Sequence, residues 1–301
     1  MPAIRSELSV PASNPRMIEK AVSSDADMVL IDLEDSVSHD RKEASRTNVI
    51  EALQGLDWDT KPPAYRMNAL DTPYFYRDLI EVLEAAGNRV RVVIVPKVGR
   101  AEHLHTVATL LAAIETRMGF EPGRIAIEAQ IESAQGLRHV EAISEATERL
   151  AALNFGPGDY AASTRMPATS IGGTDQWDEQ YPGHRFGYAM SRVVVAARAA
   201  GLRAIDGPVA NFRDLDSFRR SCVVARSLGF DSKWCIHPSQ IAIANEVFSP
   251  TEQERVWAQQ VIDAWNQATA SGQGAASIDG TMIDEASIRM AAHILQPEQE
   301  K

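Results

Sequence analysis

Two carboxylates, Glu132 and Asp159, stand at the ends of two strand-like runs in the stretches IAIEAQIES and LAALNFGPGD. A helix-like segment separates the runs, so the two strands could be neighbours whose carboxylates meet at one edge. Two carboxylates form a small oxygen-ligand site for Mg²⁺ and leave open positions for the carboxylate and carbonyl oxygens of a 2-oxo acid. They could instead be two solvated side chains at strand ends.

Other polar residues also fall where predicted strands end, or in the turns that follow. They are Glu34, Asp35, Arg66, Asn68, Lys97, Asp206 and His237. Any one of them could simply mark where a strand leaves the core. Their recurrence favours a functional mouth, because active sites of strand–helix barrels lie where the strands end. The sequence assigns no role to Glu34, Asp35, Lys97, His237 or the buried-looking Glu128.

Eight short runs look like buried strands, and seven of them lead directly into segments with helical spacing. The runs are Leu8–Ala12, Met28–Asp35, Ala64–Asn68, Val90–Val98, Ile125–Ser133, Leu150–Phe155, Leu202–Val209 and Ser232–Pro238. The segments include Pro15–Ala26, Arg41–Leu56, Tyr74–Ala86, Ala101–Arg117 and Ala134–Arg149. Eight such repeats over roughly 240 residues predict an α/β fold, a (β/α)8 TIM barrel. An open doubly wound sheet is the alternative, but it usually has fewer strands.

The run before Ser133 alternates in a way that favours the closed barrel. Apolar residues occupy every second position, and Glu128, Gln130 and Glu132 lie between them. Successive side chains of a strand point to opposite faces. We therefore expect one face to pack against helices and the other to line a barrel interior that becomes polar near its mouth.

From Ser249 onward the pattern changes, so we expect a barrel over residues 1–248 and a C-terminal lid or arm over residues 249–301. Ser249-Pro250-Thr251-Glu252 has the form of a capping box that opens a helix. Asp279-Gly280 is a turn dipeptide, and Asp284–Leu295 has the pattern of a closing helix. A helical appendage of this kind is typical of a lid or a subunit-swapping arm.

Charge and cysteine content limit the partners and the compartment. The net charge of -11 argues against a nucleic acid or an anionic membrane as partner. Two cysteines, Cys222 and Cys235, are too few for a disulfide framework. No signal peptide and no apolar run of about 18 residues is visible, so we expect a cytoplasmic protein.

Several motifs have a simple structural interpretation beside a functional one. Gly156-Pro157-Gly158 begins a match to a dinucleotide fingerprint, but it follows the sixth strand rather than the first, so we reject that function. Asn14 and Arg16 open the first helix, as a helix cap or as a phosphate cradle. Arg66 is either a surface arginine or a fork for an oxyanion. Asp284, taken alone, is most simply a helix cap.

Taken together, the motifs resemble the citrate lyase β-subunit-like family, also called the HpcH/HpaI aldolase superfamily. They are LSVPASNPRMIEKA, MVLIDLEDSV, RMN, VPKV, IESAQGL, FGPGDYAAS, IDGPVANF, KWCIHPSQIAIANEVFSPT and GTMIDEASI, which span nearly the whole chain. Within the family the chain looks closest to malyl-CoA/β-methylmalyl-CoA lyases. The segment GLDWDTKPPAYRMNALDTPYFYRDLI and the loop SIGGT carry that likeness.

The resemblance implies a role for each of the matching residues. Glu132 and Asp159 match the ligands of Mg²⁺, for which Mn²⁺ is the alternative, and Arg66 matches the arginine that meets the reacting oxygen of the substrate. Asp284 matches an acid/base aspartate that the lid of a neighbouring subunit delivers. Asn14 and Arg16 fall where relatives contact coenzyme A. Family members form homotrimers or homohexamers.

The function implied is a reversible carbon–carbon lyase that cleaves malyl-CoA to glyoxylate and acetyl-CoA, or β-methylmalyl-CoA to glyoxylate and propionyl-CoA. Its partners would be an acyl-CoA thioester and a glyoxylate-like 2-oxo acid. A malyl-CoA thioesterase is the alternative on the same scaffold. Citramalyl-CoA cleavage or an activity like that of the citrate lyase β subunit also remains open. A non-catalytic subunit would lack Glu132, Asp159 and Asp284, which are all present.

Overall fold

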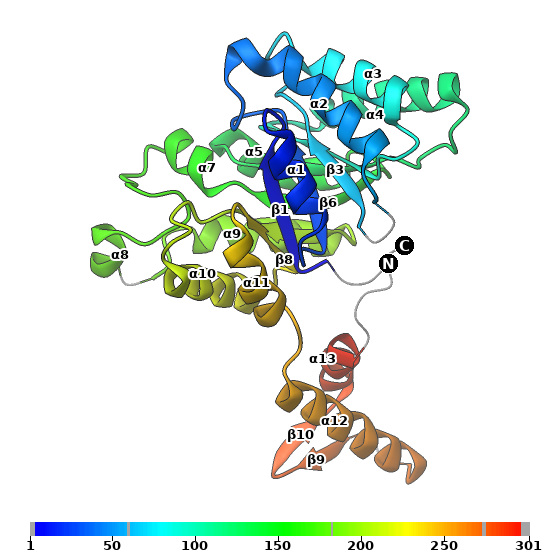
Figure 1. The fold of residues 1–301 in the computed structure, drawn as a ribbon. Coiled ribbons are helices and arrows are strands. Elements are labelled where there is room, and N and C mark those ends of the chain that lie inside the picture. The colour runs from blue at the N-terminus through cyan, green and yellow to red at the C-terminus, as the bar shows by residue number, and fades with distance from the viewer. Residues whose placement is uncertain (1–3, 59–60, 182, 273–274, 296–301) are drawn as a thin grey trace. The chain divides into compact units, whose positions relative to one another are not determined.

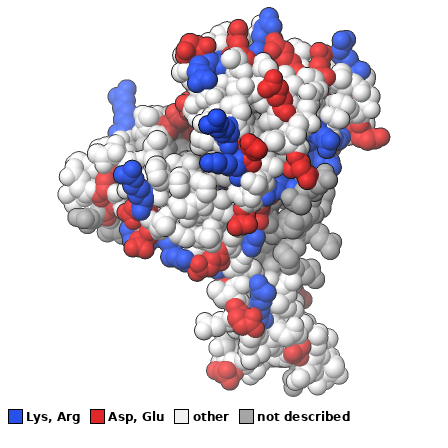
Figure 2. All heavy atoms as spheres, in the orientation of Figure 1, with Lys and Arg blue, Asp and Glu red and all other residues white. Residues whose placement is uncertain are grey.

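The computed structural model describes residues 4–58, 61–181, 183–272 and 275–295. The chain divides into two compact units, Arg5–Phe248 and a C-terminal unit that begins at Ser249, and each is described by itself (Figure 1). In the described ranges, no helix combines the length and the apolar character needed to cross a membrane. On the face that Figure 2 shows, basic and acidic side chains are interspersed.

The first unit is a closed barrel of eight parallel strands, in which β1 pairs with both β2 and β8. The strands are β1 Ser6–Pro11, β2 Met28–Asp32, β3 Pro63–Arg66, β4 Val92–Val95, β5 Ala126–Ile131, β6 Leu150–Phe155, β7 Arg203–Asp206 and β8 Ser232–Cys235. All eight lie within the predicted runs or one to two residues from them. The predicted (β/α)8 barrel is confirmed.

Helices follow every strand. They are α1 Pro15–Val22, α2 Lys42–Gly55, α3 Phe75–Ala86, α4 Ala101–Met118, α5 Ala134–Arg138, α6 Val140–Ser144, α7 Pro157–Ser163, α8 Gln176–Gln180, α9 Gly187–Ala199, α10 Leu215–Leu228 and α11 Ile241–Val247, with the short 3-10 helices η1 His39–Arg41 and η2 Pro238–Gln240. The predicted single helix over residues 134–149 is wrong. It breaks at His139, whose ring bonds the carbonyls of Gly99 and Gln135.

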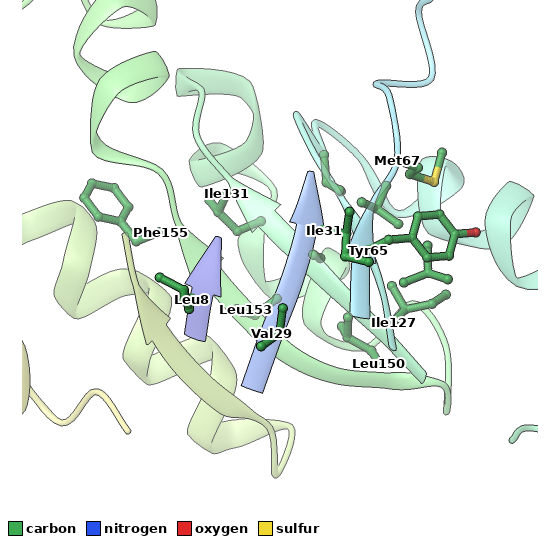
Figure 3. Packing of buried hydrophobic residues seen from close by; sticks show 14 of the residues in the cluster. Leu8, Val29, Ile31, Tyr65, Met67, Ile127, Ile131, Leu150, Leu153 and Phe155 are labelled. Carbon is green, nitrogen blue, oxygen red and sulfur yellow. The ribbon is translucent and has the colours of Figure 1, made fainter. Parts of the chain in front are cut away.

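The main core lies between the outer face of the strands and the helices. Figure 3 shows part of it, with Leu8 on β1, Val29 and Ile31 on β2, Tyr65 on β3 and Ile127 on β5. The predicted alternation along β5 is observed, since Ile127, Ala129 and Ile131 belong to this core. The burial of each large apolar side chain stabilises the fold by about 1.5–3 kcal/mol. The other face of β5 is therefore free to carry polar groups into the interior.

Strand β2 ends at Asp32, three residues earlier than predicted, because Asp32 turns the chain. Its carboxylate accepts the backbone N–H of Glu34 at 2.9 Å and that of Ser36 at 3.1 Å. A short side chain that bonds backbone two to four residues ahead competes with the strand ladder. The turn at Asp32 therefore ends β2 before Leu33.

The C-terminal unit contains two helices and a hairpin. They are α12 Glu252–Ala270, β9 Ala276–Ile278, β10 Thr281–Ile283 and α13 Glu285–Leu295. Thr251 and Glu254 form the capping box of α12, two residues later than predicted. Asp279 and Gly280 both have positive φ, which is the geometry of a tight hairpin turn. The prediction of a purely helical appendage missed the two strands.

Asp78 on α3 joins the end of β3 to α2 and is fully buried. It accepts a hydrogen bond from Arg46 Nε at 3.0 Å, and from the backbone and the side-chain amide of Asn68 at 2.9 and 2.6 Å. Asn68, which the sequence placed among the polar residues of the mouth, therefore serves the packing of the helices.

We expect Asp78→Ala to lower the free energy of unfolding by about 3–5 kcal/mol. Arg46 Nε and the two Asn68 donors lose their buried acceptor, and the buried Arg46 keeps only its pairing with the partly exposed Glu81 among the described residues. Urea denaturation followed by tryptophan fluorescence measures the change. Arg77→Ala is the control on the same helix, because Arg77 is exposed and its ion pair with Glu81 and its hydrogen bond to the Tyr76 hydroxyl contribute little to stability. Equal losses for the two variants would contradict this account of Asp78.

Candidate active site at the barrel mouth

Arg66, the last residue of β3, is held by a bidentate ion pair with Asp32 of β2. Its Nε and Nη2 donate to the two carboxylate oxygens at 2.7 and 2.8 Å. The two residues are partners in the register of neighbouring parallel strands. Planar two-point pairing fixes the guanidinium in direction as well as in place. Arg66 is thus a preorganised fork, and not a surface arginine.

The remaining nitrogen of that fork, Nη1, points to two further acceptors. It lies 3.2 Å from Glu34 Oε2 and donates to Gln130 Oε1 at 3.3 Å. The guanidinium carbon lies 5.4 Å from the ring centre of Trp234, within cation–π range. Burial by itself lowers the pKa of Arg66, but the negative charges of Asp32 and Glu34 raise that pKa by more than burial lowers it. The net shift of the pKa is upward. Burial would raise the pKa of Asp32, yet Arg66 lowers it to about 2.

Glu132 lies just beyond β5 and is 2% exposed. Its Oε1 accepts the backbone N–H of Lys97 at 2.7 Å. Burial, together with the negative charges of Asp159 and Glu34, raises the pKa of Glu132 well above its usual value despite Arg66. A nearby cation favours the charged form of a carboxyl group in such a place.

Asp159 lies in the first turn of α7, next to the end of the neighbouring strand β6. Its charge acts on both Glu132 and Lys97, so it belongs to the same mouth. Gly156, which precedes α7, makes this close arrangement possible. A Cβ at Gly156 would lie 2.5 Å from Glu132 Oε2, so only glycine leaves room for the Glu132 carboxylate.

Lys97 follows β4 and has a left-handed backbone, with φ of 52°. Its ammonium bonds Glu34 Oε1 at 2.5 Å and Asp35 Oδ1 at 3.2 Å. Burial acts to lower the pKa of Lys97, but Glu34 and Asp35 raise it, so the ammonium stays charged. A non-glycine residue at positive φ is strained, and such residues cluster at functional sites.

The donors at this mouth fit a divalent cation. Five carboxylates surround the cations Arg66 and Lys97, and they belong to Asp32, Glu34, Asp35, Glu132 and Asp159. A third cation, Lys42, bonds the backbone carbonyls of Leu33 and Glu34. Within the described ranges, no group of three or more His, Cys, Asp and Glu side chains could hold a metal ion. Mg²⁺ is commonly bound by one or two carboxylates, and water and substrate complete its coordination shell.

The contacts described above do not include the other residues that the sequence predicted at the site or the mouth. Asn14 caps α1, with its Oδ1 accepting from the N–H of Met17, and Arg16 is exposed on that helix. Asp284 caps α13 in the C-terminal unit, where hydrogen bonds from Ser287 lower the pKa of its carboxyl group. The ring of His237 stacks on Phe212, with centroids 4.6 Å apart.

Glu128 lies one layer deeper in the barrel, below the mouth. It accepts from Arg203 Nη2 at 2.8 Å and from Asn154 Nδ2 at 3.2 Å. Glu7 lies beside it and accepts from Trp234 Nε1 at 2.7 Å. Trp234 thus links this deeper polar layer to Arg66 above, so the site rests on a hydrogen-bonded floor.

Sequence reasoning missed Asp32 as a site residue, and gave Lys97 and Glu34 no role. A signal for Asp32 was available in the sequence. This carboxylate lies two residues before Glu34, and β2 would end at Asp32 if β2 and β3 were equally long. The left-handed backbone of Lys97 had a weaker signal, since Pro96 favours a turn whose next residue has positive φ, but that next residue is usually glycine.

The comparisons with known proteins agree with the fold and with the motifs. The HpcH/HpaI aldolase/citrate lyase family model matches residues 5–238. An L-malyl-CoA/beta-methylmalyl-CoA lyase of Cereibacter sphaeroides is 40% identical and covers 97% of this chain and 93% of that protein. A citrate lyase subunit beta of Leuconostoc mesenteroides is 35% identical, with 97% and 92% covered.

A solved structure also spans the chain. Protein CitE from Mycobacterium tuberculosis, in complex with magnesium, acetoacetate and coenzyme A, is 27% identical, with 98% of each chain covered and a TM-score of 0.78. The family model alone covers well over half of the chain. The chain therefore belongs to the HpcH/HpaI aldolase/citrate lyase family, and it is a carbon–carbon lyase, as the resemblance in its motifs predicts.

Proposed function

We propose that the protein cleaves malyl-CoA, or its β-methyl homologue, to glyoxylate and acetyl-CoA or propionyl-CoA, and that it also runs the reverse condensation. The observation that carries this proposal is the buried Arg66 fork directed into the same mouth as Glu132 and Asp159. The 40% identity to an L-malyl-CoA/beta-methylmalyl-CoA lyase supports the choice of substrate. Citramalyl-CoA remains an alternative, because one methyl group changes pocket affinity by only about 1–3 kcal/mol.

In this proposal Glu132 and Asp159 hold Mg²⁺, and Mn²⁺ would fit the same oxygen ligands. The bound ion would orient the hydroxy-acid end of the substrate and make its alcohol more acidic. Arg66 donates to the oxygen on which negative charge develops while the carbon–carbon bond breaks. The pairing with Asp32 keeps Arg66 charged and aimed during that change.

We assign the proton transfer at the methyl carbon of the acetyl fragment to Asp284. The hydrogen bonds from Ser287 favour the carboxylate form of Asp284, which removes a proton from the methyl carbon in the condensation. In cleavage the same carboxyl group returns that proton to the enolate carbon. We further propose that the C-terminal unit, residues 249–301, is a lid that serves a neighbouring subunit of a homotrimer or homohexamer. Asn14 and Arg16 would contact the coenzyme A part of the substrate.

The thioesterase would use the same mouth but would direct water at the thioester carbonyl. The two reactions leave different products, so one assay separates them. Malyl-CoA cleavage by the lyase releases glyoxylate and keeps the coenzyme A thiol esterified. Hydrolysis releases free thiol and no glyoxylate.

We expect incubation with malyl-CoA and Mg²⁺ to produce glyoxylate without free thiol, and we expect EDTA to abolish the reaction. A hydrazine reagent for glyoxylate and a thiol reagent, applied to one sample, measure both products. Free thiol without glyoxylate would establish the thioesterase instead. If neither product forms, the substrate assignment is wrong.

We expect Arg66→Lys to lower kcat by about 10²–10³-fold, because lysine cannot pair in two directions and aim a fork. Asp284→Asn should lower kcat by about 10²–10⁴-fold. If the lid serves a neighbour, mixed oligomers of these two variants regain activity, since some sites then combine an intact Arg66 with an intact Asp284. Full activity of Asp284→Asn alone would refute its role.

A further inference from the structure

The proposed function divides the mouth into two parts, the metal site and the arginine that meets the substrate. Lys97 is bonded to residues of both parts. Glu34 has one oxygen bonded to Lys97 Nζ and the other 3.2 Å from Arg66 Nη1. The backbone N–H of Lys97 bonds Glu132. One residue therefore connects a proposed metal ligand, through its main chain, to Arg66, through its side chain and Glu34.

We propose that Lys97 and Glu34 act together as positioning residues that hold Arg66 in register with the ligand Glu132. The inference rests on the proposed function, because it takes Glu132 as a metal ligand and Arg66 as the group that meets the substrate oxygen. Lys97 and Glu34 touch no reacting atom in this account. They set the direction of two groups that do.

The backbone of Lys97 supports this role independently of its charge. Three non-glycine residues in the described ranges have positive φ, namely Lys97, Arg165 and Asp279, and Lys97 alone of these contacts Glu132 or Glu34. Its N–H donates to Glu132, and its left-handed conformation redirects the chain that follows. Glycine would adopt that conformation without strain and would keep the same N–H. What lysine adds is the ammonium, and the partners of the ammonium are Glu34 and Asp35.

The burial of Glu34 explains why the bridge is rigid. Glu34 is 4% exposed and follows the Asp32 turn directly, so its carboxylate cannot swing out to water. Lys42 bonds the carbonyls of Leu33 and Glu34 and fixes the main chain beneath it. If the Lys97 ammonium is removed, Arg66 is the one described cation still in ion-pair distance of the Glu34 carboxylate, and the guanidinium is drawn toward it.

A test that needs no turnover uses Mn²⁺ and oxalate. Free Mn²⁺ measured by electron paramagnetic resonance gives the metal affinity, and calorimetry gives the affinity of the Mn²⁺-loaded protein for oxalate, a dianion that can chelate the ion and accept from a guanidinium. We expect Lys97→Met to keep Mn²⁺ binding and to weaken oxalate binding about tenfold or more. Lys97→Gly should behave in the same way, and Lys97→Arg should restore part of the affinity.

Glu34→Gln separates positioning from simple charge. This variant removes a negative charge from the mouth, so Coulomb attraction alone would make oxalate bind more tightly. The bridge predicts the opposite, an oxalate affinity weakened about tenfold, because the amide no longer holds both cations. Tighter or unchanged oxalate binding in Glu34→Gln would overturn the proposal.

Lys61→Met is the matched control for the loss of one ammonium. Lys61 bonds the carbonyls of Val22 and Ser24, and neither of these is a residue of the mouth. Its loss should leave Mn²⁺ and oxalate binding unchanged. Loss of Mn²⁺ binding in Lys97→Met would overturn the proposal, because Lys97 would then merely support the fold of the mouth. If the unmodified protein binds no Mn²⁺, the proposed function fails with it. If it binds Mn²⁺ and oxalate but the variants do so equally well, only this inference fails.

Discussion

The buried ion pair between Arg66 and Asp32 is the interaction on which the mouth of the barrel depends. Arg66 is 7% exposed, and its guanidinium needs carboxylates around it because an unpaired buried charge is very costly. Asp32 supplies two hydrogen bonds, and its other interactions turn the chain after β2. The same residue therefore ends the strand, fixes the fork and brings Glu34 to the site. The same interactions of Asp32 therefore end β2 and assemble the site.

The interior below the mouth determines how far these groups can move. Glu128 and Gln130 continue the inward face of β5 under Glu132, and Arg203 closes a buried network with Glu128. The ring of Trp234 makes a cation–π contact with Arg66, and its indole N–H donates to Glu7. A polar network of this kind is costly unless its members are bonded, but when they are bonded it favours one arrangement. The interior of the barrel below the mouth is therefore polar rather than apolar, and its hydrogen bonds fix the orientation of the side chains beneath the site.

Periodicity predicts the parts of this structure that depend on a repeating pattern. The eight strands, the inward direction of Glu128, Gln130 and Glu132, and the turn at Asp279-Gly280 all follow from the side-chain period or from local turn chemistry. Strand β2 ends at a local turn in which Asp32 accepts the backbone N–H groups of Glu34 and Ser36. The break at His139 and the left-handed Lys97, in contrast, involve contacts with residues far along the chain. Asn68 shows the same limit, because its position at a strand end did not reveal that Asp78, ten residues later, would bind it. Partners distant in sequence leave no periodic trace.

The electrostatics of the mouth bear on which group moves the proton in the proposed reaction. Asp32 is held as a carboxylate with a pKa of about 2, and Glu34 is bonded between two cations. Glu132 accepts a backbone N–H and, with Asp159, faces the proposed metal. A group that exchanges a proton during turnover must be free to change charge without breaking the frame, and these carboxylates are parts of the frame. The acid/base group is therefore better supplied from outside the barrel, which is why we assign it to Asp284 on the C-terminal unit. In the proposed reaction Asp284 exchanges the proton, and the ion pairs that hold Arg66 and Lys97 remain intact.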